Sequence, residues 1–293
     1  MAADTRLGRQ VALKTVLPAL SAKLGRDGVA ALLQEARIVS TLSHPNIVPL
    51  YDAFEDAGVS YLVFEYVEGQ SLADLIRQSG KLETGRAVVI AIALAQAVAY
   101  AHERNIVHRD IKPGNVMITR DGVPRLMDFG IASSAAAAGA DSRTLLGTPS
   151  YMAPEYIEEG IYLPSSDVFA LGVVLYEMLT GTRPFRAPTP LAAAIRRAQR
   201  RQPVSSVRPE APKHWTEVIE KCLEYDAASR YPSAAAVADA LRQPPSRIAR
   251  ARSAMGRASD VQRAVWLVLA VLLLGGLGAW LWYGLRGYYQ PTR

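Results

Sequence analysis

Four polar side chains that could do chemistry together stand close to one another in the sequence. Residues 106–115 have the sequence Ile-Val-His-Arg-Asp-Ile-Lys-Pro-Gly-Asn, and Asp128 follows in the tripeptide Asp-Phe-Gly. The Pro-Gly pair prevents a helix, so this stretch is predicted to be a loop whose turn brings Asp110 and Asn115 to one side. Asp110 would accept a proton from an attacking hydroxyl, and Lys112 would neutralise negative charge beside it. The side-chain oxygens of Asn115 and Asp128 would ligate magnesium, with manganese as an alternative ion.

The order and spacing of these motifs are typical of one family of enzymes. His-Arg-Asp-x-x-x-x-Asn followed by Asp-Phe-Gly resembles the eukaryotic-like (Hanks-type) protein kinases, whereas either motif alone would be explained by an ordinary loop and turn. The resemblance implies an α+β fold with two lobes, a small β-rich N-lobe and a larger helical C-lobe. It also implies transfer of the γ-phosphoryl group of ATP, with Asp110 as the base and Lys112 beside the phosphoryl group.

The stretch from residue 147 to residue 155 indicates which hydroxyl groups would be phosphorylated. Its sequence, Gly-Thr-Pro-Ser-Tyr-Met-Ala-Pro-Glu, resembles the end of the activation segment in serine/threonine kinases. In that family Lys112 and Thr148 together mark the serine/threonine branch. Ser and Thr side chains of proteins are therefore the expected substrates.

Regulation is expected in the segment just before that stretch. Residues 133–144 are rich in alanine and have little side-chain surface to pack. The resemblance implies that Arg109 pairs with a phosphate on this segment and so orders it. Ser142 and Thr144 are the expected phosphorylation sites, and autophosphorylation is expected.

The N-terminal part of the sequence contains the expected phosphate-binding lysine. Residues 9–16 alternate and are rich in β-branched side chains, which predicts a strand. This strand resembles the Val-Ala-Ile-Lys strand of kinases, so Lys14 would hold the phosphates of ATP. A helix is predicted over residues 27–42, and its Glu35 would be the ion-pair partner of Lys14, although each residue alone would be explained as a surface charge. The apolar positions that define this helix are Ala30, Leu33, Ile38 and Leu42.

Two further strands are predicted over residues 47–54 and 59–67, joined by a turn. Phe64 occupies the position of the family's gatekeeper residue, where its ring would close much of the pocket behind adenine. The hinge, residues 65–68, follows directly. By resemblance, backbone groups of Glu65 and Val67 would bind the adenine base.

The rest of the kinase-like region is predicted to be mainly helical. By resemblance, residues 106–115 form the catalytic loop, whose backbone Asp167 would anchor, and Arg230 would pair with Glu155. A small hairpin is predicted around the turn 120–122, which would deliver Asp128 to the site. Helices are predicted over residues 71–78, 84–104, 165–180, 190–200, 213–223 and 233–241.

The net charge of +6 belongs entirely to the C-terminal tail. Residues 1–245 contain 26 Lys and Arg against 26 Asp and Glu, whereas residues 246–293 contain seven Arg and one acidic residue. The kinase-like region therefore has no basic excess, and no nucleic-acid partner is expected. Cys222 is the single cysteine, which excludes an intrachain disulfide and a zinc site built on cysteines.

The tail is predicted to anchor the chain in the cell membrane. Residues 244–263 would be a basic juxtamembrane linker. Residues 264–285 contain no charge, and a helix of that length spans about 33 Å, enough to cross a bilayer once. A buried helix of a soluble domain is the alternative. Arginines of the linker outnumber those of the short extracytoplasmic tail, residues 286–293, which places the kinase region in the cytoplasm. Residues 275–278, Gly-Gly-Leu-Gly, could pack two spans, so a homodimer is left open.

The sequence is similar to bacterial receptor-like, membrane-anchored kinases but differs from them at its start. A partial N-lobe is expected over residues 1–66 and the C-lobe over residues 67–243. Residues 2–9 resemble the hairpin after the family's glycine-rich loop, yet no Gly-x-Gly-x-x-Gly motif precedes Lys14. A start site placed too far downstream would explain this and is favoured, because the later catalytic positions are all filled. The alternative is a membrane-tethered pseudokinase that acts as a scaffold.

Overall fold

The computed structural model describes residues 2–16, 18–130, 148–185 and 202–242. The chain divides after Arg242 into two units, and every described element belongs to the first. Several predictions lie outside the described residues: the phosphorylation sites Ser142 and Thr144, the helix over residues 190–200, the linker, the membrane span and the external tail.

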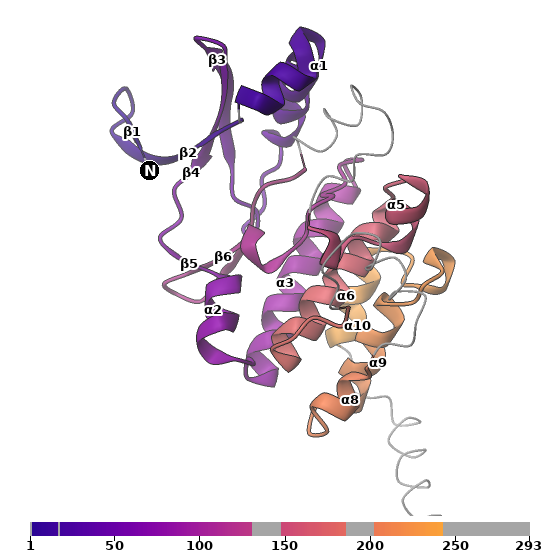
Figure 1. The fold of residues 1–293 in the computed structure, drawn as a ribbon. Helices are drawn as coiled ribbons and strands as arrows, with labels where there is room; N and C mark the ends of the chain where they lie inside the picture. Colours follow the sequence, from indigo (N-terminus) through magenta and orange to yellow (C-terminus); the bar gives the residue numbers. More distant parts are fainter. Residues whose placement is uncertain (1, 17, 131–147, 186–201, 243–293) are drawn as a thin grey trace, which may run out of the picture. The chain divides into compact units, whose positions relative to one another are not determined.

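A four-stranded antiparallel sheet forms the N-lobe (Figure 1). Its spatial order is β1 (Ala2–Asp4), β2 (Arg9–Thr15), β4 (Val59–Glu65) and β3 (Leu50–Asp56). The predicted turn joins β3 to β4, with Ala57 at φ 48° and Gly58 at φ 75°. Two successive left-handed residues match the twist of a tight hairpin, and the second of them is glycine, which adopts this conformation without strain.

The helix α1 (Pro18–Val39) packs against β3 and β4. It begins earlier than predicted and contains a non-helical residue, Gly25. It also ends earlier, because the Ser40 and Thr41 hydroxyls donate to the last helical carbonyls, those of Arg37 and Ile38.

The predicted apolar face of α1 is partly wrong, since Leu42 is buried and Leu33 packs against the core but Ala30 and Ile38 are exposed. Leu32, Ala36 and Val39 are the buried side chains, whereas Ile38 is 47% exposed. Leu32, Ala36 and Val39 follow the spacing of four and three residues that places side chains on one helical face. The predicted set combined residues from two faces.

A second, three-stranded sheet lies where the two lobes meet and contains β5 (Gly69–Ser71), β6 (Val116–Thr119) and β7 (Pro124–Leu126). The predicted hairpin is confirmed as β6 and β7, whereas the three-residue β5 was not predicted. A Cβ on Gly69 would lie 2.0 Å from the carbonyl oxygen of Ile118, so only glycine allows β5 to approach β6 this closely.

The C-lobe is built from helices around α3 (Thr84–His102) and α6 (Pro164–Thr180). These two helices pack on each other, α10 (Ala234–Arg242) packs on both, and α9 (Lys213–Cys222) packs on α6 (Figure 1). Among the described helices, α3 is the only one long and apolar enough to cross a membrane, and half of its apolar stretch is buried in the protein. The remaining helices are α2 (Leu72–Ser79), α5 (Pro154–Glu159) and α8 (Val204–Val207).

Residues 45–49 belong to the N-lobe and are hydrogen-bonded to β7. Residues 47–49 were predicted to belong to the strand over residues 47–54, but β3 begins only at Leu50. Ile47 instead forms a parallel bridge with Leu126 of β7, and the Val48 amide donates to the Leu126 carbonyl at 2.8 Å. This N-lobe segment is therefore hydrogen-bonded to the strand that leads to Asp128.

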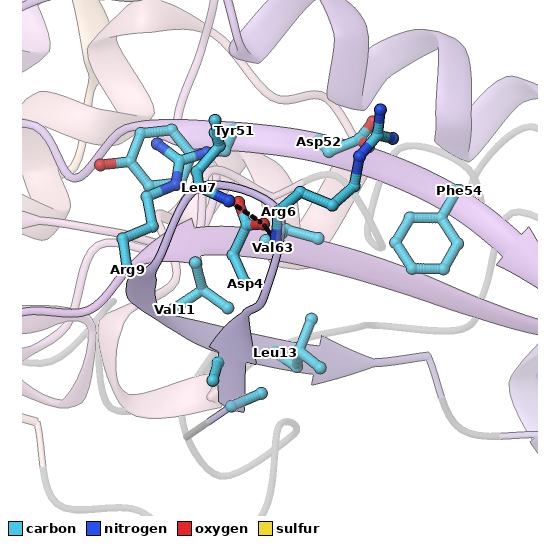
Figure 2. A pocket seen from close by; sticks show the side chains of 12 residues that line it. Asp4, Arg6, Leu7, Arg9, Val11, Leu13, Tyr51, Asp52, Phe54 and Val63 are labelled. Carbon is cyan, nitrogen blue, oxygen red and sulfur yellow. Dashed lines mark hydrogen bonds and ion pairs between the residues drawn. The ribbon is translucent and has the colours of Figure 1, made fainter.

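A cavity of about 490 Å³ opens on the face of the N-lobe sheet away from Lys14 (Figure 2). Leu13 and its cross-strand neighbour Val63 line it, and alternation along β2 directs Lys14 to the other face. The Arg9 guanidinium stacks over the Tyr51 ring at its rim, 3.6 Å from the ring centroid. This cavity is separate from the candidate site.

Candidate active site

The catalytic loop holds Asp110 between a cation and an amide. Lys112 Nζ lies 2.6 Å from Asp110 Oδ2, and Asn115 Nδ2 donates to the same oxygen at 2.9 Å and to the Asp110 carbonyl at 2.8 Å. A single 3₁₀ turn, Pro113–Asn115, brings Asn115 back to Asp110, as expected for a loop that contains Pro-Gly. The side-chain amide nitrogen of Asn115 is used by Asp110, which leaves its oxygen as the atom able to face a metal ion.

Asp167 supports this loop from inside the C-lobe. Its carboxylate is fully buried and accepts the amide hydrogens of His108, at 2.8 Å, and Arg109, at 3.0 Å. The His102 imidazole, at the end of α3, contacts the same carboxylate at 2.8 Å. The predicted anchor is therefore present, and three donors orient it.

His108 connects the catalytic loop to the segment carrying Asp128. Its Nδ1 accepts from the Asp110 amide at 3.2 Å, and its Nε2 lies 3.1 Å from the Met127 carbonyl. Because Nδ1 accepts a hydrogen bond, the hydrogen of the ring is on Nε2, which donates to the Met127 carbonyl, and burial lowers the pKa of His108. The ring also packs on Phe129, with 4.5 Å between centroids. The two halves of the site are thus joined through one side chain.

Asp128 has the free acceptor that a metal site needs. Its Oδ2 pairs with Lys14 Nζ at 3.0 Å, whereas its Oδ1 is buried without a hydrogen-bond partner among the described groups. Within the described ranges no three His, Cys, Asp or Glu side chains enclose a metal position. Asp128 and Asn115 fit magnesium, which commonly takes one or two protein ligands and completes its shell with phosphate oxygens and water.

The predicted pair between Lys14 and Glu35 is wrong for this structure. Glu35 Oε1 lies 3.2 Å from Arg109 Nη1, and Lys14 pairs with Asp128 instead. The guanidinium is weakly hydrated and its backbone is held by Asp167, which makes it a suitable partner for a half-buried carboxylate. Burial raises the pKa of Glu35 to about 7, against the opposing effect of Arg109. Arg109, which was expected to bind a phosphate, is therefore paired with a residue of α1.

The predicted pair between Glu155 and Arg230 is present and buried. Two guanidinium nitrogens each lie 2.8 Å from a different Glu155 oxygen, and the Ser166 hydroxyl donates to the carboxylate at 2.7 Å. Burial by itself would raise the pKa of Glu155, but the hydrogen bonds from Arg230 and Ser166 leave it below its ordinary value. The pair joins α5 to the segment that follows the 3₁₀ turn Ala227–Ser229, and Arg230 also donates to the Ser165 carbonyl of α6, so the pair supports the C-lobe.

The structure also places the remaining predicted residues. Phe64 is buried, and the Glu65 amide donates to the Pro49 carbonyl at 3.0 Å, while Val67 is half-buried in the segment between β4 and β5. Thr148 lies beside the catalytic loop. A small recess is lined by Arg109, Asp110, Ile111, Thr148, Tyr151, Met152 and Tyr162.

Sequence reasoning missed two supporting side chains, His102 and Arg125. His102 lies at the end of a predicted helix, and Arg125 alternates with apolar residues in a predicted strand. Their position next to the loop and next to Asp128 was a signal, but their partners, Asp167 and Glu65, are distant in sequence. Such pairings become visible only when the fold is known.

Comparisons with known proteins identify the family. The model of the protein kinase domain matches residues 1–242, and the chain belongs to this family. The family predicted from the two motifs and their spacing is confirmed.

Bacterial relatives carry the names of serine/threonine kinases. The chain is 37% identical over 249 residues to the probable serine/threonine-protein kinase PknB of Bifidobacterium longum, covering 80% of this chain and 36% of that protein. It is 35% identical to PrkC of Bacillus subtilis, covering 80% and 36%. It is also 35% identical to PknA of Mycobacterium tuberculosis, covering 83% and 58%. The chain thus spans little more than a third of the length of the first two relatives.

A solved structure supports the fold. The crystal structure of Rad53 1-466 in complex with AMP-PNP matches with a TM-score of 0.64 and 27% identity, covering 79% of this chain and 57% of that one. Together with the family match, this similarity confirms the predicted kinase fold with a β-sheet N-lobe and a helical C-lobe.

Proposed function

We propose that this protein transfers the γ-phosphoryl group of ATP to Ser and Thr hydroxyls of proteins. The observation that carries the proposal is the Asp110 carboxylate, held by Lys112 at 2.6 Å and Asn115 at 2.9 Å, while Asp128 Oδ1 is buried with no hydrogen-bond partner among the described residues. The names of the bacterial relatives support the serine/threonine class. The nucleotide analogue in the Rad53 complex supports ATP as the donor.

The chain's own groups would divide the work of the reaction. Asp110 accepts the proton of the attacking hydroxyl, and Lys112, already beside it, offsets the charge that develops during transfer. Lys14 holds the nucleotide phosphates, and backbone groups of Glu65 and Val67 bind adenine. Asp128 and Asn115 would hold magnesium, or manganese, which would neutralise charge on the phosphates.

Labelled ATP tests this proposal. We expect the full chain to incorporate label on Ser and Thr, in itself and in a general protein substrate. Asp110→Asn should lower the rate about a hundred- to ten-thousandfold. Asp121→Asn, an exposed carboxylate in the β6–β7 turn, is the matched control and should keep the rate. A wild-type chain that incorporates no label would support the pseudokinase scaffold instead, and label on Tyr would contradict the serine/threonine class.

We further propose that phosphorylation of the segment before Thr148 activates the enzyme. Arg109 is available as the phosphate-binding cation once Glu35 releases it, and the two hydroxyls expected to accept phosphate are Ser142 and Thr144. Mass spectrometry after incubation with ATP should find phosphate on one of them. Equal activity in a chain with alanine at both positions would contradict this regulation.

We propose that residues 264–285 anchor the enzyme in the cell membrane, with the kinase domain in the cytoplasm. The support is the uncharged run between the arginine-rich linker and the short tail. The chain should sediment with membranes and resist carbonate extraction, and deletion of residues 244–293 should release it. Pairing of two spans through residues 275–278 would make a homodimer, which crosslinking in the membrane would detect.

A further inference from the structure

One arginine of β7 reaches the hinge. Pro124 and Leu126 on either side of it are buried, and alternation along the strand turns Arg125 to the opposite face, where its side chain is 21% exposed. There it forms an ion pair with Glu65, the last residue of β4. Its Nε also donates to the Pro45 carbonyl at 3.3 Å. One C-lobe side chain thus contacts two N-lobe segments.

The backbone around this pair is held as well. The Leu126 amide donates to the Asn46 carbonyl and the Val48 amide to the Leu126 carbonyl, both at 2.8 Å. The Glu65 amide in turn donates to the Pro49 carbonyl at 3.0 Å. Glu65 is therefore anchored through its amide on residues 45–49 and through its carboxylate on Arg125. Both anchors lead back to β7.

We propose that Arg125 is a positioning residue for the adenine site. The proposal rests on the proposed function, in which backbone groups of Glu65 and Val67 bind the base. Arg125 holds the first of these residues in place and stands only three residues before Asp128, the expected metal ligand. A single short strand would then set the distance between the adenine end and the phosphate end of the bound nucleotide.

A brace that only stabilises the fold would behave differently from one that positions adenine. Loss of general stability would weaken binding of every part of the nucleotide. Loss of hinge position would weaken binding of the base and leave the phosphate end unchanged, because Lys14 and Asp128 do not contact Arg125 through any described hydrogen bond or ion pair. Two partial ligands separate these cases: adenosine, which has no phosphates, and inorganic tripolyphosphate with magnesium, which has no base.

The experiment measures the affinity of the full chain for adenosine, magnesium tripolyphosphate and ATP by calorimetry. Arg125→Met keeps the length of the side chain and removes its charge, and Glu65→Gln removes the other charge. We expect either change to weaken adenosine and ATP about tenfold, which corresponds to about 1.4 kcal/mol. Tripolyphosphate affinity should stay within about twofold. The double variant should be no weaker than the worse single variant, because both remove one interaction.

A neighbouring ion pair provides the matched control. Arg120 Nη1 lies 3.0 Å from Glu68 Oε2, and this pair also joins the β6–β7 hairpin to the hinge region, but its side chains are 80% and 55% exposed. Exposed pairs contribute little, so Arg120→Met should leave all three affinities unchanged. Wild-type affinity for adenosine in Arg125→Met, or equal weakening of adenosine and tripolyphosphate, would overturn the proposal. A wild-type chain that binds tripolyphosphate but no adenosine would overturn the adenine site itself, and the positioning role with it.

Discussion

Two arginine–glutamate pairs in this protein differ in their geometry and in their burial. Arg230 binds Glu155 through two contacts of 2.8 Å, with side chains 0% and 12% exposed. Arg109 binds Glu35 through one contact of 3.2 Å, with side chains 32% and 26% exposed. The first pair was predicted correctly, whereas Glu35 was expected to bind Lys14.

The difference lies in how many arrangements satisfy the groups involved. Arg230 also donates to the carbonyls of Glu224, Ser165 and Tyr225, so any other position would leave buried groups unpaired. Glu35 lies in a helix that packs on β3 and β4 of the N-lobe sheet, and its one described ion pair is with Arg109. The C-lobe pair is buried and held by several hydrogen bonds, whereas the Glu35–Arg109 pair between the lobes is half-buried and held by a single described contact.

The largest effect is expected from breaking the buried pair. Arg230→Ala leaves the Glu155 carboxylate buried without its cation, and it also removes the guanidinium from above the Phe169 ring. Such a loss costs about 3 to 5 kcal/mol of unfolding free energy. Urea denaturation of the full chain measures it. Arg242→Ala removes an exposed pair with Asp239 and should cost under about 1 kcal/mol. Equal losses in the two variants would contradict the distinction between buried and exposed pairs.

A smaller effect is expected at the anchor of the catalytic loop. Asp167→Asn keeps one acceptor oxygen but turns an amide group toward a donor, either the His108 amide or the Arg109 amide. The expected loss is about 1 to 3 kcal/mol of stability, the typical cost of an unsatisfied buried group. Because the same amides precede Asp110, the catalytic rate should fall while affinity for ATP is kept. A variant with normal rate and lowered nucleotide affinity would contradict this anchoring role.

The sequence predicted contacts within a lobe better than contacts between the lobes. Contacts made within one short loop, such as Asp110 with Lys112 and Asn115, were predictable because five residues of chain bring them together. Strands and helices of the C-lobe were also predictable from apolar spacing. By contrast, β5 and α8 are three and four residues long, too short for a periodic signal. The partners of Glu35 and Arg125 depend on the relative position of the lobes, which local sequence does not specify.

The smallest effect is expected in the pH dependence of stability, at the pair of Glu35 with Arg109. Burial raises the pKa of Glu35 to about 7 in the folded protein, above the ordinary value of about 4.3 for an unfolded chain. Between these two values the folded state binds more protons than the unfolded state, so the contribution of Glu35 to stability falls as pH rises toward 7. Glu35→Gln removes this proton and its titration. The unfolding temperature of the wild type should therefore decline relative to that of the variant between about pH 5 and pH 7.5, which is roughly the interval over which Glu35 titrates.

The exposed Glu103→Gln is the control for that measurement, because its carboxylate is 71% exposed and its loss should leave the pH dependence of the wild type unchanged. A constant difference between wild type and Glu35→Gln across this range would mean that Glu35 titrates normally. The structural cause would then be a tighter pair with a cation, as first expected with Lys14, since a close positive charge lowers the pKa of a carboxylate. The same titration thus distinguishes the Arg109 partner, at 3.2 Å and partly solvated, from a closer one.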